Sequence, residues 1–201
     1  GNAEVRLDEM VAAYAAFARG GTFLPPRFVA GAPSVAPRTL VSPRTAFWIT
    51  DVLSDADARA FAFGRGGSLE FPFEVAAKTG TSQAYHDNWA IGYTRAVTVG
   101  VWVGNFDRTP LVGSSGVMGA GPIFHAVMLA AANRAGEALP DPIDAATSAT
   151  PVRTSRQTIC ALSGLPAGPD CPNQEEEWVP DDGPRAACDW HRRTPRGIVV
   201  D

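Results

Sequence analysis

Proline divides this 201-residue chain into two parts of different character. Eight of its 17 prolines fall in residues 1–136, whereas nine fall in the 65 residues that follow. Proline fixes φ and lacks an N–H, so it is confined to the ends and edges of regular structure. The sequence therefore predicts an ordered part over 1–136, a linker over 137–154, and a small Cys-containing tail over 155–201 that leads towards a further domain.

Composition excludes two classes of protein. The net charge is −4 with no basic stripe, so a nucleic-acid partner is not expected, because phosphate binding relies on clustered cations. No apolar stretch approaches the roughly 18 residues of a spanning helix, so this segment is not expected to cross a membrane. Hydrophobic residues make up 45% of the chain, which is enough for a packed core.

Periodicity predicts an α+β fold in the first part. Valine at 97, 99, 101 and 103 alternates with Thr98, Gly100, Trp102 and Gly104, as in a strand with one buried face. We expect a sheet of antiparallel strands packed by helices, without a βαβ rhythm. The expected helices cover 7–18, 42–54 and 122–135, the last apolar almost all round and buried. The expected strands cover 71–82, 89–94 and 97–106.

Lys78 is the only lysine among 17 basic residues. Lysine is a compact charge with a movable pKa, which suits proton relays and hydroxyl networks better than the rigid arginine fork. Gly80 lies within the same predicted strand, where glycine often marks the close approach of a ligand or another backbone. With the hydroxyls of Thr79 and Thr81, this strand could bind a peptide that carries a carboxylate. Taken alone, Lys-Thr-Gly is equally compatible with an ordinary strand.

The surroundings of this motif resemble the penicillin-recognising serine enzymes, whose third signature is Lys-Thr-Gly. The resemblance is carried by residues 46–55, 58–60, 62–64, 71–73, 78–82, 87–94, 99–105 and 119–124. It is similar to the C-terminal part of the transpeptidase domain of class A penicillin-binding proteins, most of all the 1C type. The tail pattern, with Cys160, Cys171 and Cys188-x-x-His191, also fits that type.

This resemblance implies a D,D-transpeptidase that cross-links peptidoglycan stem peptides through a serine acyl-enzyme and is acylated by β-lactams. Lys78 would hold the hydroxyl network and attract the substrate carboxylate. Thr79 and Thr81 would bind that carboxylate and the substrate backbone, with the Thr81 N–H as an oxyanion donor, and Gly80 would leave room for the substrate. No cofactor is expected. The implied location is the periplasm, anchored in the inner membrane through a segment outside this chain.

Two catalytic motifs of that family are missing. A Ser-x-x-Lys nucleophile would need Ser at position 75, which is Val75, and no Ser has Asn two residues later. Nothing resembles the glycosyltransferase expected in a bifunctional parent. We therefore expect a segment that is inactive alone and depends on the missing N-terminal part of the same enzyme. The alternatives are a non-catalytic cell-wall interaction module, or a relative of D,D-carboxypeptidases and β-lactamases.

Other polar and aromatic residues near the motif have structural interpretations. Asp87 and Asn88 are expected in a turn, and Trp102 in the core. His86 and His125 are expected to be structural or on the surface.

The tail could hold a metal or a disulfide. Cys160, Cys171, Cys188 and His191 could complete a Cys₃His zinc site. Because the resemblance implies an oxidising compartment, a Cys171–Cys188 disulfide is the preferred expectation, with no metal. Either would stabilise a unit too small to bury much core, for which Leu162, Leu165, Trp178 and Trp190 are the expected apolar residues.

Overall fold

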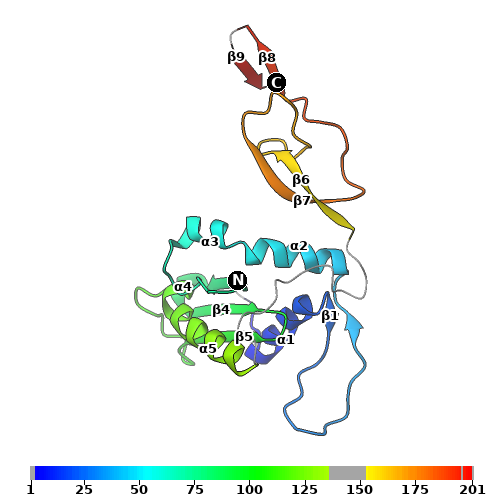
Figure 1. The fold of residues 1–201 in the computed structure, drawn as a ribbon. Helices are drawn as coiled ribbons and strands as arrows, with labels where there is room; N and C mark the ends of the chain where they lie inside the picture. The colour runs from blue at the N-terminus through cyan, green and yellow to red at the C-terminus, as the bar shows by residue number, and fades with distance from the viewer. Residues whose placement is uncertain (1–2, 136–152, 196, 201) are drawn as a thin grey trace. The chain divides into compact units, whose positions relative to one another are not determined.

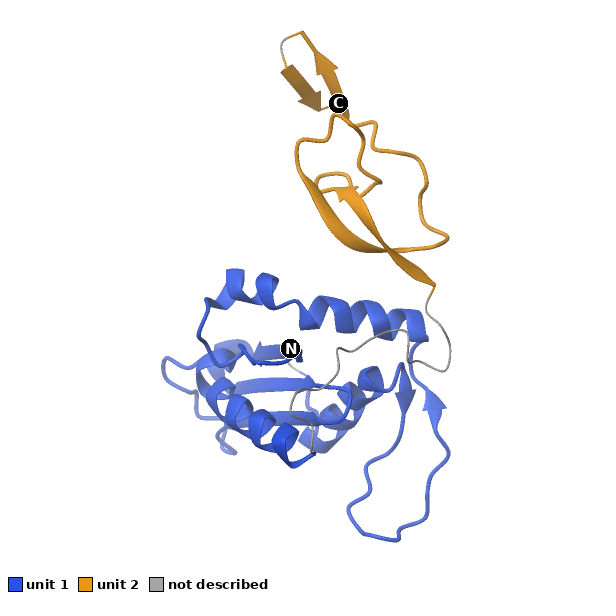
Figure 2. Ribbon diagram, viewed as in Figure 1, with its two compact units in different colours: residues 1–151 blue, residues 152–201 orange. Residues whose placement is uncertain are grey.

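The computed structural model describes residues 3–135, 153–195 and 197–200 (Figure 1). The chain divides into two compact units, residues 1–151 and 152–201 (Figure 2). The expected linker over 137–154 lies outside the described residues except for its last two positions. None of the described helices is long and apolar enough to span a bilayer.

Unit 1 is built on a three-stranded antiparallel sheet in the order β3-β4-β5. Its strands are β3 (Ala76–Thr81), β4 (Asp87–Tyr93) and β5 (Thr98–Gly104). Five helices accompany it: α1 (Leu7–Ala18), α2 (Pro43–Ser54), α3 (Ala56–Phe63), α4 (Gly116–Gly119) and α5 (Gly121–Arg134). A small ribbon, β1 (Thr22–Phe23) with β2 (Arg38–Thr39), and the 3₁₀ turn η1 (Gln83–Tyr85) complete the unit. This arrangement confirms the predicted α+β class (Figure 1).

The core lies between one face of the sheet and α5. Val99 and Val101 are buried there against Phe124 and Met128, as the valine alternation predicts. Helix α1 packs on the opposite face, where a Cβ on Gly100 would lie 2.5 Å from a Val11 methyl. Tyr93, fully buried, stacks on Phe17 of α1.

Capping residues explain where α2 begins, as predicted, and where α3, which was not predicted, begins. Helix α2 begins as expected, with Ser42 accepting from the Thr45 N–H at 3.1 Å and proline at the first turn. The chain then bends at Asp55, whose side chain accepts from the Ala58 N–H at 2.8 Å and starts α3. No helix was predicted over these residues, because Asp55 reads equally as the end of α2.

Two expectations about extent were wrong. Regular pairing begins only at Ala76, whereas the strand was expected from residue 71; Phe71 and Phe73 instead pack against the core outside the ladder. Helix α5 is buried along one side only, and Ile123 and Val127 remain 48% and 44% exposed.

Unit 2 consists of two antiparallel strand pairs. The first joins β6 (Thr154–Cys160) to β7 (Gln174–Pro180), and the second joins β8 (His191–Thr194) to β9 (Gly197–Val200). Residues 197–200, in the segment expected to lead towards a further domain, form β9 and pair with β8. The expected apolar core is wrong in part, because Leu162 and Trp190 are 59% and 44% exposed.

Candidate active site

The Lys-Thr-Gly-Thr motif forms the last four residues of β3. Within the part of the chain that the structure describes, β3 pairs only with β4, so its other side is an unpaired edge. The side chains of Lys78 and Thr81 are exposed, and Thr79 and Gly80 are half-buried. The motif therefore lies where an extended peptide could be added to the sheet.

Backbone direction supports this placement. The Ser82 N–H donates to the Asp87 carbonyl of β4 at 3.0 Å. Because backbone groups of successive residues in a strand point to opposite sides, the N–H groups of Thr79 and Thr81 point to the unpaired edge. The Lys78 ammonium donates to the Thr79 carbonyl oxygen at 2.6 Å, which places its positive charge beside the same edge.

Helix α4 holds the end of the motif strand in place. The Gly116 N–H donates to the Thr81 hydroxyl oxygen at 2.9 Å. A Cβ on Gly116 would clash with the Gly80 carbonyl oxygen and lie 2.9 Å from that of Trp89, so only glycine allows this approach. Since the Thr81 oxygen accepts from Gly116, its own proton remains available for another acceptor.

Asn88 is the site residue whose placement the sequence did not predict. It lies within β4 opposite Thr81, fully buried, rather than in the expected turn. Its Nδ2 donates to the Ser114 hydroxyl at 2.6 Å, which ties the segment before α4 to the sheet. Its Oδ1 is buried and has no hydrogen-bond partner among the described residues. Asn is common in turns, so nothing in the local sequence signals a buried strand position.

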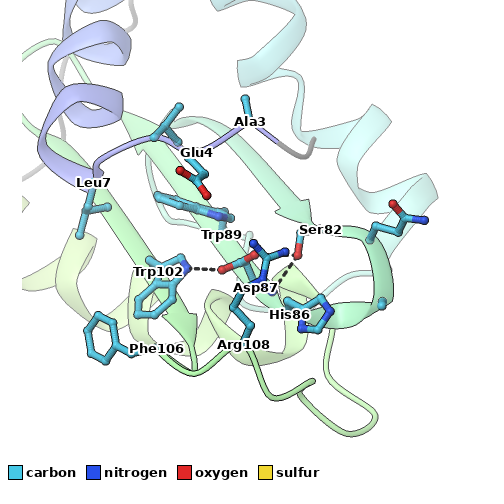
Figure 3. Close-up of a pocket in the computed structure, with 13 residues that line it drawn as sticks. Ala3, Glu4, Leu7, Ser82, His86, Asp87, Trp89, Trp102, Phe106 and Arg108 are labelled. Carbon is cyan, nitrogen blue, oxygen red and sulfur yellow. Dashed lines mark hydrogen bonds between the residues drawn. The ribbon is translucent and has the colours of Figure 1, made fainter.

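Asp87 is anchored by two side chains at the start of β4 rather than being part of a turn. Trp102 Nε1 donates to one carboxylate oxygen at 2.9 Å, and the Ser82 hydroxyl donates to the other at 2.8 Å (Figure 3). The Asp87 N–H in turn donates to the Ser82 oxygen at 2.9 Å. The hydrogen bond from Trp102 has the largest effect on the pKa of Asp87 and, with that from Ser82, lowers it below its ordinary value of 3.8. Burial opposes the shift.

A cavity of about 690 Å³ lies beyond the end of β3. Figure 3 shows Trp89 and Trp102 beside Asp87, with Arg108 and His86 nearby. Trp102 lines this cavity and is only half-buried, so its expected core position is wrong. Lys78 is not among the lining residues, so the cavity and the motif edge are neighbouring but separate features.

The two histidines of unit 1 differ in their surroundings. His125 packs in a structural role, as expected, with its ring stacked on Phe71 at 4.7 Å between centroids and Nδ1 at 3.2 Å from the Ser68 carbonyl oxygen. His86 lines the cavity.

In unit 2 the structure brings together the four residues of the alternative metal site. The ligand atoms of Cys160, Cys171, Cys188 and His191 all lie within 4.8 Å of one another. All three cysteines are free thiols, so the disulfide preferred from the sequence is not formed.

The chain belongs to the penicillin-binding protein transpeptidase family. A family model described as the penicillin binding protein transpeptidase domain matches residues 5–129. The fold agrees, because the structure superimposes on penicillin-binding protein 1A of Haemophilus influenzae with a TM-score of 0.66. That match covers 90% of this chain and 32% of the other, at 19% identity.

The relatives confirm the resemblance inferred from the sequence. Penicillin-binding protein 1C of Escherichia coli is 33% identical over 184 residues, which is 90% of this chain and 22% of the relative. Penicillin-binding protein 1A of Mycobacterium tuberculosis is 33% identical over 131 residues, or 58% of this chain and 16% of the relative. The chain therefore spans about a fifth of the length of these relatives. With 184 aligned residues and unit 1 ending at 151, the 1C alignment must reach into unit 2.

Proposed function

We propose that this chain supplies the substrate-binding edge of a D,D-transpeptidase that cross-links peptidoglycan stem peptides and reacts with β-lactams. The observation that carries the proposal is the unpaired edge of β3, where the N–H groups of Thr79 and Thr81 and the Lys78 ammonium lie together. Membership of the transpeptidase family supports a peptide substrate with a terminal carboxylate.

In this proposal the stem peptide binds as an added strand along β3. Lys78 attracts the terminal carboxylate and holds the hydroxyl network beside the nucleophile. The Thr81 hydroxyl donates a hydrogen bond to the same carboxylate. A charge-assisted hydrogen bond of this kind contributes about 1.5 to 3 kcal/mol. The Thr81 N–H faces the position of the developing oxyanion, and one such donor is worth about 2.7 to 4 kcal/mol.

The nucleophile comes from another segment. A serine hydroxyl attacks the D-Ala-D-Ala carbonyl, D-Ala leaves, and an amine on a neighbouring strand takes the acyl group. This chain has no Ser-x-x-Lys sequence, because its single lysine is preceded three positions earlier by Val75. The chain alone is therefore inactive. The proposal also places it in the periplasm, in a membrane-anchored enzyme that carries a glycosyltransferase.

A chimera tests this proposal. The chain replaces the matching 184 residues of penicillin-binding protein 1C of Escherichia coli, and intact mass spectrometry follows incubation with a fluorescent penicillin. We expect one covalent adduct on the chimera and none on the 201-residue chain alone. A chimera that melts as cooperatively as its parent but takes up no penicillin would reject the transpeptidase and favour the non-catalytic interaction module.

A further inference from the structure

Unit 2 is organised around four side chains that meet in one small space. His191 Nδ1 lies 3.6 Å from the Cys160 sulfur and 3.5 Å from the Cys188 sulfur. With the Cys171 sulfur, these ligand atoms all lie within 4.8 Å of one another.

Two of these separations have the length expected around a tetrahedral zinc ion. With Zn–S near 2.3 Å and Zn–N near 2.0 to 2.1 Å, tetrahedral angles place sulfur and nitrogen ligands about 3.5 Å apart and two sulfurs about 3.8 Å apart. The two sulfur–nitrogen distances of His191 agree with the first of these values.

The same four residues form the buried interior of the unit. Among the described residues of unit 2, the buried ones are Gly168 and the four ligands Cys160, Cys171, Cys188 and His191. Leu165 and Ala167 pack against the three cysteines and are only partly buried. A unit of this size with so little apolar core needs a cross-link or a metal to remain folded.

The backbone holds the ligands at this distance. The Cys160 N–H donates to the Leu165 carbonyl at 2.8 Å, and the Cys188 N–H donates to the Pro166 carbonyl at 2.8 Å, so one loop positions both residues. The Gly168 N–H donates to the Cys171 sulfur at 3.3 Å, a contact that orients this sulfur. A Cβ on Gly168 would lie 2.8 Å from the Cys188 carbonyl oxygen, so glycine permits the close packing of the loops.

We propose that Cys160, Cys171, Cys188 and His191 bind one structural Zn²⁺ ion, which takes the place of a hydrophobic core in unit 2. Four protein ligands close the coordination shell and leave no position for substrate, so the ion is structural and not catalytic. Three soft thiolates and an imidazole select Zn²⁺ over hard cations such as Ca²⁺ or Mg²⁺. The proposal goes beyond the transpeptidase function and does not depend on it.

A disulfide would involve only two of these four residues. A Cys171–Cys188 bond would leave the Cys160 thiol and the His191 imidazole dispensable, although both are buried and face each other. The zinc site needs all four residues. Variants of Cys160 and His191 therefore distinguish the two.

The test measures metal content and thiols in the full chain, purified without chelator from zinc-supplemented culture. We expect about one zinc per chain by elemental mass spectrometry, and three titratable thiols after denaturation with chelator. Replacement of zinc by Co²⁺ should give the visible absorption of a tetrahedral thiolate site. Two fewer thiols, with the mass of a disulfide and no zinc, would overturn the proposal, as would three thiols with no zinc.

Cys160→Ser and His191→Asn should each weaken zinc affinity at least about 10-fold, since even outer-shell changes cost a metal site this much. Occupancy is therefore compared in the presence of a competing chelator, at a concentration that leaves the wild type loaded. His86→Asn is the matched control, since His86 lies in unit 1, and should retain full occupancy. Because a variant of unit 2 can fail to fold, cooperative melting of unit 1 is recorded for each protein. Full zinc occupancy in Cys160→Ser or His191→Asn would refute the four-ligand site.

Discussion

At the scale of single residues, Asp87 shows how a residue with an ordinary turn signal becomes a fixed part of a site. Its carboxylate accepts from Trp102 and Ser82, and these contacts hold the first residue of β4 against the end of β3. The sequence contains both partners, at positions 82 and 102. Only pairing of the strands brings them to one carboxylate, so local pattern could not predict the contact.

Asp87→Asn should lower the free energy of unfolding by about 1.5 to 3 kcal/mol near neutral pH, since charge-assisted hydrogen bonds are lost. The pKa of Asp87 is lowered in the folded chain, so its contribution is present above the ordinary value of 3.8 and disappears as the pH falls through the folded pKa. The difference from wild type should therefore shrink in acid. Chemical denaturation at several pH values measures it.

Asp107→Asn is the matched control for that experiment. Asp107 accepts from the Thr109 N–H at 2.9 Å in a turn, a contact that an Asn oxygen can also make. A loss in Asp87→Asn no larger than in Asp107→Asn would contradict the anchoring role.

Lys78 and its neighbours illustrate what sequence can predict about a site. The motif and its strand follow from residue type and context. The direction of the Thr79 and Thr81 N–H groups, and the support of Thr81 by Gly116, depend on the register with β4 and on a helix 35 residues away in sequence. The register is set by the short connection between β3 and β4, whose 3₁₀ turn over Gln83–Tyr85 was not predicted.

At the scale of elements, the predicted helices over 7–18 and 42–54 were correct because periodicity and capping agree there. The length of the first strand was overestimated because the apolar residues before Ala76 were taken as part of the strand. The burial of α5 was overestimated because its apolar residues were all taken as buried. Ile123 and Val127 show that an apolar pattern does not specify how much of a helix its neighbours cover.

Two glycines in β3 and β4 should separate folding from function. A Cβ at Gly80 would lie 3.6 Å from the Trp89 Cβ, an ordinary contact, so Gly80→Ala should change stability by less than about 0.5 kcal/mol. In the chimera with penicillin-binding protein 1C it should slow penicillin acylation, because the proposal assigns Gly80 the role of leaving room for the substrate. Stopped-flow or gel-based labelling measures the rate.

A Cβ at Gly92 would lie 2.6 Å from the Ala76 carbonyl oxygen and 2.7 Å from the Phe124 ring. Gly92→Ala should therefore destabilise unit 1 by about 1 to 3 kcal/mol through overpacking. Equal thermal destabilisation by both alanine variants would show that Gly80 serves the fold and not the substrate.

Side-chain truncation on α5 tests which face carries the core. Phe124 is fully buried between Phe71 and the sheet, so Phe124→Ala should cost about 3 to 5 kcal/mol. Ile123→Ala, its exposed neighbour, should cost well under half as much. Urea unfolding of both variants gives the free energies to compare. Similar losses of stability in the two variants would contradict a core that lies on the Phe124 side of α5.

At the scale of the whole molecule, the two compact units should unfold separately. If zinc replaces the core of unit 2, a strong chelator should make residues 152–201 susceptible to protease while unit 1 retains its melting temperature. Limited proteolysis with mass mapping, with and without chelator, follows both units. Equal protection of unit 2 in chelator would contradict a metal-dependent fold.

The central claim is that the Lys78 ammonium at the edge of β3 serves acylation. The most direct measurement is the rate of penicillin acylation of the chimera with penicillin-binding protein 1C, compared with its Lys78→Ala and Arg65→Ala variants; Arg65 is an exposed cation paired with Asp57 and serves as control. We predict a loss of at least roughly 10- to 150-fold for Lys78→Ala, equivalent to one charge-assisted hydrogen bond, and an unchanged rate for Arg65→Ala. Wild-type acylation by a folded Lys78→Ala chimera would contradict the assigned role.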